Sequence, residues 1–222
     1  MGSNRGTTST DALRTLVTPS RLRSYVDATP DLHSALTLYE WNMRASASVM
    51  ELVGIVEVVT RNALDRELAT WARRRHPDST WLDQVPLDPQ GRSDLVKARG
   101  RASRNGRRPE VHGRVVAELT FGFWRYLVES RYLTTLWIPA LHSAFPHGPH
   151  DLLTRQREVR ARLQQLHFVR NRAAHHEPIH ERDLRRDHDD AIELLGWIHP
   201  AAAEWAQDVA SLRAVLRARP SA

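Results

Sequence analysis

A short segment near the middle of the C-terminal half, residues 170–178 (RNRAAHHEP), concentrates polar side chains beside an apolar stretch. Asn171 and His175 are four residues apart, so a helix would place them on one face. Histidine can transfer protons near neutral pH, and arginine can stabilise charge that builds up on a phosphate in a transition state. Arg170, Asn171 and His175 therefore suit cleavage of RNA without a metal or a cofactor, with the imidazole handling the proton of the 2′-hydroxyl or of the leaving group.

The same segment admits two other interpretations. Arginine and histidine in the last turn of a helix interact favourably with the helix dipole, by about 0.3–1 kcal/mol each, so a purely structural role is an alternative. A metal site is another, and its candidate ligands are His175, His176, Glu177, His180 and His188. Pro178 ends the predicted helix, which breaks the register that would align His176 with His180. We therefore predict no metal ligands here.

A long helix is predicted over residues 32–75, which contain no proline and only one glycine, Gly54. Its expected buried stripe recurs every three or four residues and comprises Leu36, Tyr39, Met43, Ala47, Met50 and Val53. The stripe then meets Glu57 and Arg61, with Asn62 directly after them. These three polar residues either line a pocket that supports the motif, or Glu57 and Arg61 simply pair with each other.

The chain is basic, with a net charge of +6, and arginine supplies all but one of its 32 basic side chains. The guanidinium fork matches phosphate geometry well, although codon usage in a GC-rich genome would enrich arginine too. The densest cluster of basic side chains comprises Lys97, Arg99, Arg101, Arg104, Arg107 and Arg108. Nearby in sequence only Glu110 opposes them, so we predict RNA contact, with a solvated loop as the alternative.

The rest of the chain also reads as helical, because no run of alternating β-branched residues is present. Residues 1–18 are predicted to be a disordered tail, and residues 19–218 one all-α domain that begins with a short helix at 19–27. Residues 76–91 are predicted to be a proline-rich connection without a regular element. Further helices are expected at three places, residues 151–176, 183–197 and 201–217.

Two sets of apolar residues are predicted to lie in the core. The aromatic block at residues 111–141 resembles a base-stacking platform in composition, but its helical spacing among leucines favours core packing; its key residues are Phe121, Trp124, Val128, Tyr132 and Trp137. The last helix is expected to turn Trp205, Val209, Leu212 and Leu216 inward. On the helix at 151–176, four arginines are expected on the wet face: Arg155, Arg157, Arg160 and Arg162.

The composition excludes several classes of protein. The chain has no cysteine, which rules out disulfides, thiol catalysis and Cys-ligated zinc. No apolar run approaches the roughly 18 residues that a membrane span needs, and the first residues lack the apolar centre of a secretory signal. We therefore expect a cytoplasmic protein with no membrane partner.

The segment RNRAAHHEPI resembles the Arg-x4-6-His motif of the HEPN superfamily, in the version carried by Abi-like (abortive infection) proteins. The blocks LYEWNMRASASVMELVGIVEVVTRNAL, FGFWRYL and RYLTTLW are similar to that family too, so the resemblance covers about residues 18–218. It implies a HEPN-like helical bundle with a long N-terminal helix and additional C-terminal helices. It also implies a symmetric homodimer with a composite site at the interface, in which Arg170 and His175 are the catalytic pair.

The resemblance assigns lesser roles to other residues. Asn171 takes the polar position after the arginine, Glu57, Arg61 and Asn62 are candidates for a supporting shell, and His176 is a neighbour of the catalytic pair. The function implied is an endoribonuclease that acts in antiphage defence or as a toxin, restrained by an antitoxin protein or a small RNA. The alternative is a non-cleaving HEPN protein that binds a structured small RNA.

Overall fold

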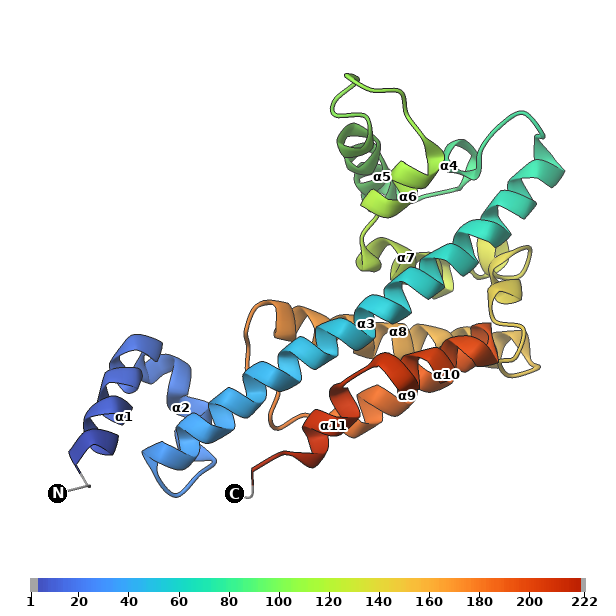
Figure 1. Ribbon diagram of the computed structural model, residues 1–222. Coiled ribbons are helices and arrows are strands. Elements are labelled where there is room, and N and C mark those ends of the chain that lie inside the picture. The colour runs from blue at the N-terminus through green and yellow to red at the C-terminus, as the bar shows by residue number, and fades with distance from the viewer. Residues whose placement is uncertain (1–3, 221–222) are drawn as a thin grey trace. The chain divides into compact units, whose positions relative to one another are not determined.

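The computed structural model describes the backbone of residues 4–220 and the side chains of residues 10–220. Within this range all regular elements are helical and none is a β-strand, which confirms the all-α prediction. The elements, shown in Figure 1, are α1 (Asn4–Val17), α2 (Pro19–Asp27), α3 (Leu32–Arg75), α4 (Trp81–Gln84), α5 (Pro89–Ala102), α6 (His112–Glu118), α7 (Phe121–Leu127), η1 (Ser130–Tyr132), η2 (Leu133–Trp137), η3 (Leu141–Ala144), α8 (Leu152–Ala174), α9 (Leu184–Ile198), α10 (Pro200–Val209) and α11 (Leu212–Arg217).

The chain forms two compact units, and three helices contribute residues to both. Unit 1 comprises Met1–Leu52, Val169–His188 and Ala210–Ala222; unit 2 comprises Val53–Phe168 and Asp189–Val209. Helices α3, α8 and α9 each pass from one unit to the other along the chain. The prediction of a single domain over residues 19–218 stays a prediction.

Helix α3 confirms the long helix predicted for residues 32–75 and runs without interruption through Gly54 (Figure 1). Leu36 and Val53 are buried as predicted, but between them the buried stripe departs from the predicted one. Met43 is 56% exposed, whereas Leu38, Trp41 and Ala45 are buried. A helix in which apolar residues occur all around offers several stripes of the same period, so periodicity alone does not choose among them.

Unit 1 is built where the first half of α3 packs against α2 and α11. Tyr25 of α2 is fully buried, and its ring meets that of Tyr39 on α3 edge to face, with centroids 5.2 Å apart. The indole of Trp41 donates a hydrogen bond to the carbonyl of Val215 in α11, at 2.9 Å. These contacts bring the C-terminal end of the described chain onto the long helix.

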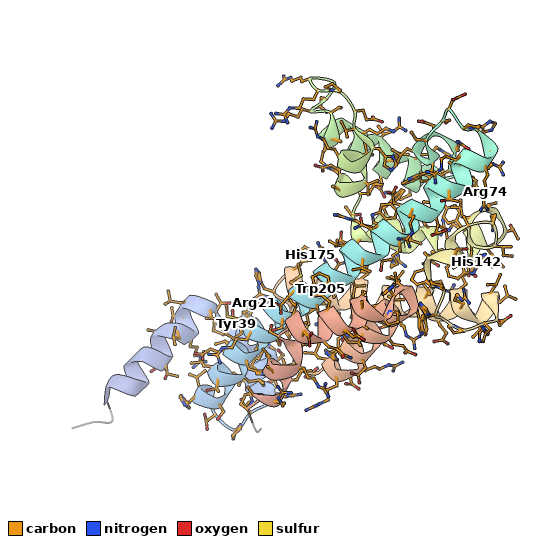
Figure 2. The ribbon with its side chains drawn as sticks, turned by 45° about the vertical axis from the view of Figure 1, so that its right-hand side comes forward. Arg21, Tyr39, Arg74, His142, His175 and Trp205 are labelled. Carbon is orange, nitrogen blue, oxygen red and sulfur yellow. The ribbon has the colours of Figure 1, made fainter. Side chains whose placement is uncertain are left out.

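The prediction of a single helix over residues 201–217 is wrong, because the helix is interrupted between α10 and α11. Ser211 precedes α11, and its backbone N–H donates to the carboxylate of Glu51 at 2.8 Å. An acidic group at this place satisfies an unpaired N–H at the start of the helix and interacts well with the helix dipole. Because α10 and α11 are separate, Trp205 (labelled in Figure 2) and Val209 do not share an inward face with Leu212: they are 50% and 49% exposed, and Leu212 is 1% exposed.

Unit 2 has an aromatic core. The predicted core residues of the block at 111–141 are all buried, which confirms that prediction: Phe121, Trp124, Val128, Tyr132 and Trp137. The indole of Trp81 contacts that of Trp124 at 5.8 Å between centroids and donates to Asp65 at 2.6 Å. Aromatic rings bury large areas, so this cluster contributes strongly to the apolar core of the unit.

The predicted connection at residues 76–91 contains more structure than expected. It holds the short helix α4 and the first turn of α5. Pro89 occupies the first turn of α5, where its missing N–H breaks no intrahelical bond. Asp88 caps this helix by accepting a hydrogen bond from the backbone N–H of Gly91 at 2.7 Å. Proline there starts a helix instead of excluding one.

The start of the chain also differs from the sequence prediction. Residues 4–17, expected to belong to a disordered tail, form α1, whose second half (DALRTLV) contains good helix formers and neither glycine nor proline. Residues 1–3 lie outside the described part of the chain. None of the helices in that part combines the length and the apolar composition needed to cross a bilayer.

Two arginines expected on the wet face of α8 are instead enclosed. Arg155 is buried, and its Nε donates to the carbonyl of Pro149 at 2.7 Å. Arg162 lies among three carboxylates and over the ring of Trp197, whose centroid is 4.5 Å from its Cζ. Of these partners only Glu158 lies on α8, four residues before Arg162. The others come from segments outside the helix, so the pattern of α8 alone does not reveal them.

Candidate functional site

Helix α8 ends at Ala174, two residues earlier than predicted, in a turn stabilised by two backbone hydrogen bonds. The N–H of Glu177 donates to the carbonyl of Arg172 at 2.8 Å, and the N–H of His176 donates to that of Ala173 at 3.1 Å. His176 has a φ of 56°, which is the left-handed conformation that this pair of bonds requires. The helix therefore ends in a Schellman motif with histidine at the position usually taken by glycine, and Pro178 follows it.

Two arginines outside the predicted catalytic pair hold this turn. Arg172 donates from Nε and from a terminal nitrogen to the carbonyl of Pro178, at 3.2 and 2.7 Å, and lies 3.3 Å from the carboxylate of Glu177. Arg21, on α2, donates to the carbonyl of His176 at 2.9 Å. Hydrogen bonds from charged donors are roughly twice as strong as neutral ones, so the turn is firmly anchored.

The segment after the turn is anchored in the interior of unit 1. The backbone N–H of Ile179 donates to the side-chain oxygen of Asn42 at 2.8 Å, and Asn42 is only 3% exposed. His180 is 1% exposed, lies 3.3 Å from the hydroxyl of Ser24 through Nε2, and packs on the ring of Tyr25. Burial lowers the pKa of His180 below its usual value, so its neutral form is favoured.

The candidate ligands of the metal site considered as an alternative differ in burial. His176 and Glu177 are exposed on the turn, whereas His180 and His188 are both buried. Over the described residues, no group of three His, Cys, Asp or Glu side chains is placed to hold a metal ion. The geometry thus offers no cluster of ligands built from this segment.

Arg170, Asn171 and His175 lie together at the end of α8. Arg170 donates to the side-chain oxygen of Asn171 at 3.2 Å, and the backbone N–H of His175 donates to the carbonyl of Asn171 at 3.0 Å. Arg170 is half-buried, and no carboxylate in the described part of the chain lies within ion-pair distance of it. His175, labelled in Figure 2, is exposed. A guanidinium with donors to spare and an accessible imidazole are groups that metal-independent phosphodiester cleavage can use.

The remaining predicted site residues lie in the other unit. Arg170, Asn171, His175 and His176 belong to unit 1, whereas Glu57, Arg61 and Asn62 belong to the part of α3 in unit 2. Nε of Arg61 is buried without a hydrogen-bond partner among the described residues. The structure brings the four motif residues together; the supporting role of the other three stays a prediction.

The predicted RNA-binding cluster divides into two groups. Arg99 forms ion pairs with Asp83 at 2.5 Å and with Glu110 at 3.4 Å. The hydrogen bond that Arg99 donates to Asp83 lowers the pKa of Asp83. Arg101 donates to the carboxylate and carbonyl of Glu118, at 2.7 and 2.6 Å. Lys97 lies 4.0 Å from Asp94. Asp94 lies on α5 with Lys97, whereas Asp83 and Glu118 come from other segments. Glu110 is therefore not the only acid that opposes these three basic residues.

The second group lies on the loop between α5 and α6. Arg104, Arg107 and Arg108 are exposed, and no ion pair involves them within residues 10–220. The loop turns through three consecutive residues with positive φ, namely Arg104 at 50°, Asn105 at 55° and Gly106 at 82°. This tight turn projects the second group into solvent, where it is available to a polyanion.

Three positioning residues were not identified from the sequence: Arg21, Asn42 and Arg172. Arg172 lies inside the motif, and an arginine next to a proline-terminated helix end is a sequence signal for a contact with the last carbonyls. Asn42 was also detectable in principle, as a polar residue amid buried positions of a long helix. Arg21 lies 155 residues from its partner, and nothing in its local sequence points to that contact.

Comparison of the chain with protein-family models, with curated proteins and with solved structures found no match. The candidate site therefore stands on its own residues and their geometry.

Proposed function

We propose that this chain is a metal-independent endoribonuclease of the Abi-like HEPN type, acting in antiphage defence or as a toxin. The observation that carries the proposal is the pairing, on one anchored helix end, of a guanidinium without a carboxylate partner and an accessible imidazole. Arg170 and His175 have the Arg-x4-His spacing, and the Schellman turn and Arg172 fix the backbone that carries them. Fixed geometry is what catalysis requires beyond the presence of the right groups.

In the proposed reaction, the 2′-hydroxyl of RNA attacks the adjacent phosphorus. One imidazole takes the proton of that hydroxyl. A second proton donor gives a proton to the 5′-oxygen as it leaves. The products are a 2′,3′-cyclic phosphate and a 5′-hydroxyl, so atoms and charge balance without a cofactor. Arg170 stabilises the negative charge on the phosphorane oxygens. Asn171 orients the guanidinium of Arg170 by accepting a hydrogen bond from it.

One His175 side chain cannot act as the base and as the acid at the same time. A symmetric dimer that brings two motifs together would supply a second imidazole, with one acting as the base and the other as the acid. We therefore include a homodimer with a composite site in the proposal. Control of such an activity in the cell, by an antitoxin protein or a small RNA, belongs to the same proposal.

The test is cleavage of single-stranded RNA by the purified full chain in the presence of EDTA. We expect products that carry a 2′,3′-cyclic phosphate, and a loss of roughly 10²–10⁴-fold in rate for His175→Ala. The matched control is His176→Gly, since glycine readily adopts the left-handed conformation of residue 176, so the turn and the activity should survive. Cleavage that needs a divalent metal, or that His175→Ala leaves intact, would falsify the mechanism.

A second candidate function is favoured by the exposed arginines of the α5–α6 loop. Arg104, Arg107 and Arg108 have the character of a surface for binding a structured small RNA without cleaving it. In that case the wild-type protein and His175→Ala bind the RNA equally, with a salt-sensitive affinity, and neither cuts it. Expression in cells separates the two candidates too: a toxic nuclease stops growth, and Arg170→Ala relieves the arrest.

A further inference from the structure

Unit 1 contains a basic cavity that the candidate active site does not use. It has a volume of about 380 Å³ and lies between the first turn of α9 and the end of α11, both labelled in Figure 1. This volume is near the lower end of the roughly 300–1,000 Å³ found for small-ligand sites. Its polar lining consists of Arg182, Asp183, Arg185, Arg217 and Arg219, and the indole of Trp41 contributes to the wall.

Two of the charged residues in the lining already have partners. Arg182 binds Asp187 through two hydrogen bonds, of 2.5 and 2.6 Å, and Asp187 is buried. Asp183 accepts a hydrogen bond from the backbone N–H of Arg186 at 3.1 Å, which caps the start of α9. The Arg182–Asp187 pair is neutral as a whole, whereas Asp183 keeps its negative charge in the lining and is outnumbered there by the three remaining arginines.

The other three arginines of the lining have no acidic partner among the described residues. Arg185, Arg217 and Arg219 are exposed, and none forms an ion pair in the part of the chain that the structure describes. The guanidinium carbon of Arg219 lies 5.2 Å from the ring centroid of Trp41, a distance at which a cation–π interaction orients the guanidinium. Trp41 itself is 4% exposed and fixed by its hydrogen bond to Val215, so it forms a rigid wall.

Helix electrostatics alone do not explain this arrangement. Arg217 is the last residue of α11, where a cation interacts favourably with the helix dipole. Arg185 occupies the opposite situation, in the first turn of the 15-residue helix α9, where the dipole disfavours a cation. Gathering three like charges from two separate elements costs electrostatic energy, which an anion bound among them would recover.

We propose that this cavity binds a phosphate group, carried either by a free nucleotide or by the end of an RNA strand. Arg185, Arg217 and Arg219 supply forked N–H donors to the phosphate oxygens, and guanidinium groups suit such multiple contacts. The inference does not rest on the proposed nuclease activity, because neither Arg170 nor His175 lines the cavity. The cavity is a binding site and needs no chemical step.

Inorganic pyrophosphate is the first probe, titrated into the full chain by isothermal calorimetry at low salt. We expect saturable binding that weakens at least about tenfold in Arg185→Ala and in the double variant Arg217→Ala/Arg219→Ala. Arg213→Ala is the matched control, since it removes the same charge from α11 at an exposed position outside the cavity. Arg185→Ala also guards against a fold defect, because it leaves the contact between Arg219 and Trp41 intact.

A second arm distinguishes the two sources of the phosphate. A short fluorescent RNA is added with either a 5′-phosphate or a 5′-hydroxyl, using His175→Ala protein so that cleavage cannot interfere. Tighter binding of the phosphorylated RNA, displaced by pyrophosphate, identifies a strand end as the ligand; equal binding of both, with pyrophosphate still bound at the cavity, identifies a free nucleotide. Absence of saturable pyrophosphate binding, or an equal loss in Arg213→Ala, overturns the proposal.

Discussion

Two arginine-rich segments of this protein use their side chains in different ways. At the end of α8, Arg172 and Arg21 hold the turn, and Asn42 holds the segment that follows it in the interior. On the α5–α6 loop, Arg104, Arg107 and Arg108 form no ion pair with any described residue. The turn is closed by Ser103, whose hydroxyl accepts from the N–H of Gly106 at 3.1 Å and whose carbonyl accepts from that of Arg108 at 2.9 Å, and by a bond from the N–H of Asn105 to the carbonyl of Gly100 at 2.7 Å.

This difference matches two different physical demands. Phosphodiester cleavage depends on the placement of a base and a cation to within fractions of an ångström, so it needs side chains on an anchored element. Attraction of a polyanion depends mainly on the number of charges and tolerates loose geometry. Under the proposed function, the end of α8 would therefore carry out the chemistry, and the exposed arginines of the loop would attract the RNA.

The largest expected effect comes from replacing Arg170, and its matched comparison is the replacement of Arg172. Arg170→Ala should lower the rate of RNA cleavage by roughly 10²–10³-fold, because it removes stabilisation of the transition-state charge, and should leave the melting temperature unchanged. Arg172→Ala should instead lower the free energy of unfolding by roughly 1–3 kcal/mol, because it deletes the bonds to Pro178 and Glu177. Kinetics and thermal unfolding of both variants check this; a reversal of the two phenotypes would reassign the roles.

The next effect concerns the loop. Replacing Arg104, Arg107 and Arg108 together by alanine should weaken RNA binding at least about tenfold and reduce the slope of log K against log salt by about 2, at roughly 0.7 per lost phosphate contact. The matched control is Arg99→Ala/Arg101→Ala, which should mainly lower stability, by up to about 1 kcal/mol per ion pair. Equal salt slopes for the triple variant and the wild type would show that the loop does not contact RNA.

A smaller effect tests the anchoring of the segment after the motif. Asn42→Ala leaves the buried N–H of Ile179 without an acceptor, which should cost roughly 1–3 kcal/mol of unfolding free energy. Cleavage should fall as well, because the turn that carries His175 loses part of its support. Ser24→Ala serves as the control, since its contact with His180 is longer, at 3.3 Å, and should cost less. Chemical denaturation of both variants measures the difference.

The smallest effect at neutral pH is expected for Tyr25→Phe. The hydroxyl of Tyr25 is buried without a hydrogen-bond partner among the described residues, so its removal should change stability by less than about 1 kcal/mol at pH 7. Burial raises the pKa of Tyr25 to about 12. Because this folded-state pKa lies above the unfolded value of about 10, the contribution of Tyr25 to stability is complete below pH 10 and is lost as the pH rises toward 12.

Denaturant unfolding from pH 9 to 11.5 checks the sign of this prediction. The wild type should lose more stability over that range than Tyr25→Phe, which has no group to ionise at this position. If both proteins lost stability equally, Tyr25 would not be shielded from solvent, and the interior anchoring of the segment beside it would be in doubt.

Local signals in the sequence predicted several features well. The bounds of α2 and α3 follow from a proline, a lack of helix breakers and helical periodicity, and the structure has both helices as predicted. The aromatic core of unit 2 followed from helical spacing. Predictions that needed rotation about a helix axis were less accurate: Met43 and Trp205 were placed inside, and both are exposed.

The sequence by itself determined the all-α class and the spacing that brings Arg170, Asn171 and His175 onto one helix end. These properties depend on interactions between residues a few positions apart, so a linear pattern contains them. Only the tertiary structure decided which arginines pair with acidic side chains and which remain without an ion-pair partner among the described residues. The partners of Arg99, Arg101 and Arg162 and the donor to His176 come from distant segments, and the basic cavity is lined by residues from α3, α9 and α11. Ion pairs form wherever packing places the charges, which the order of residues along the chain does not reveal.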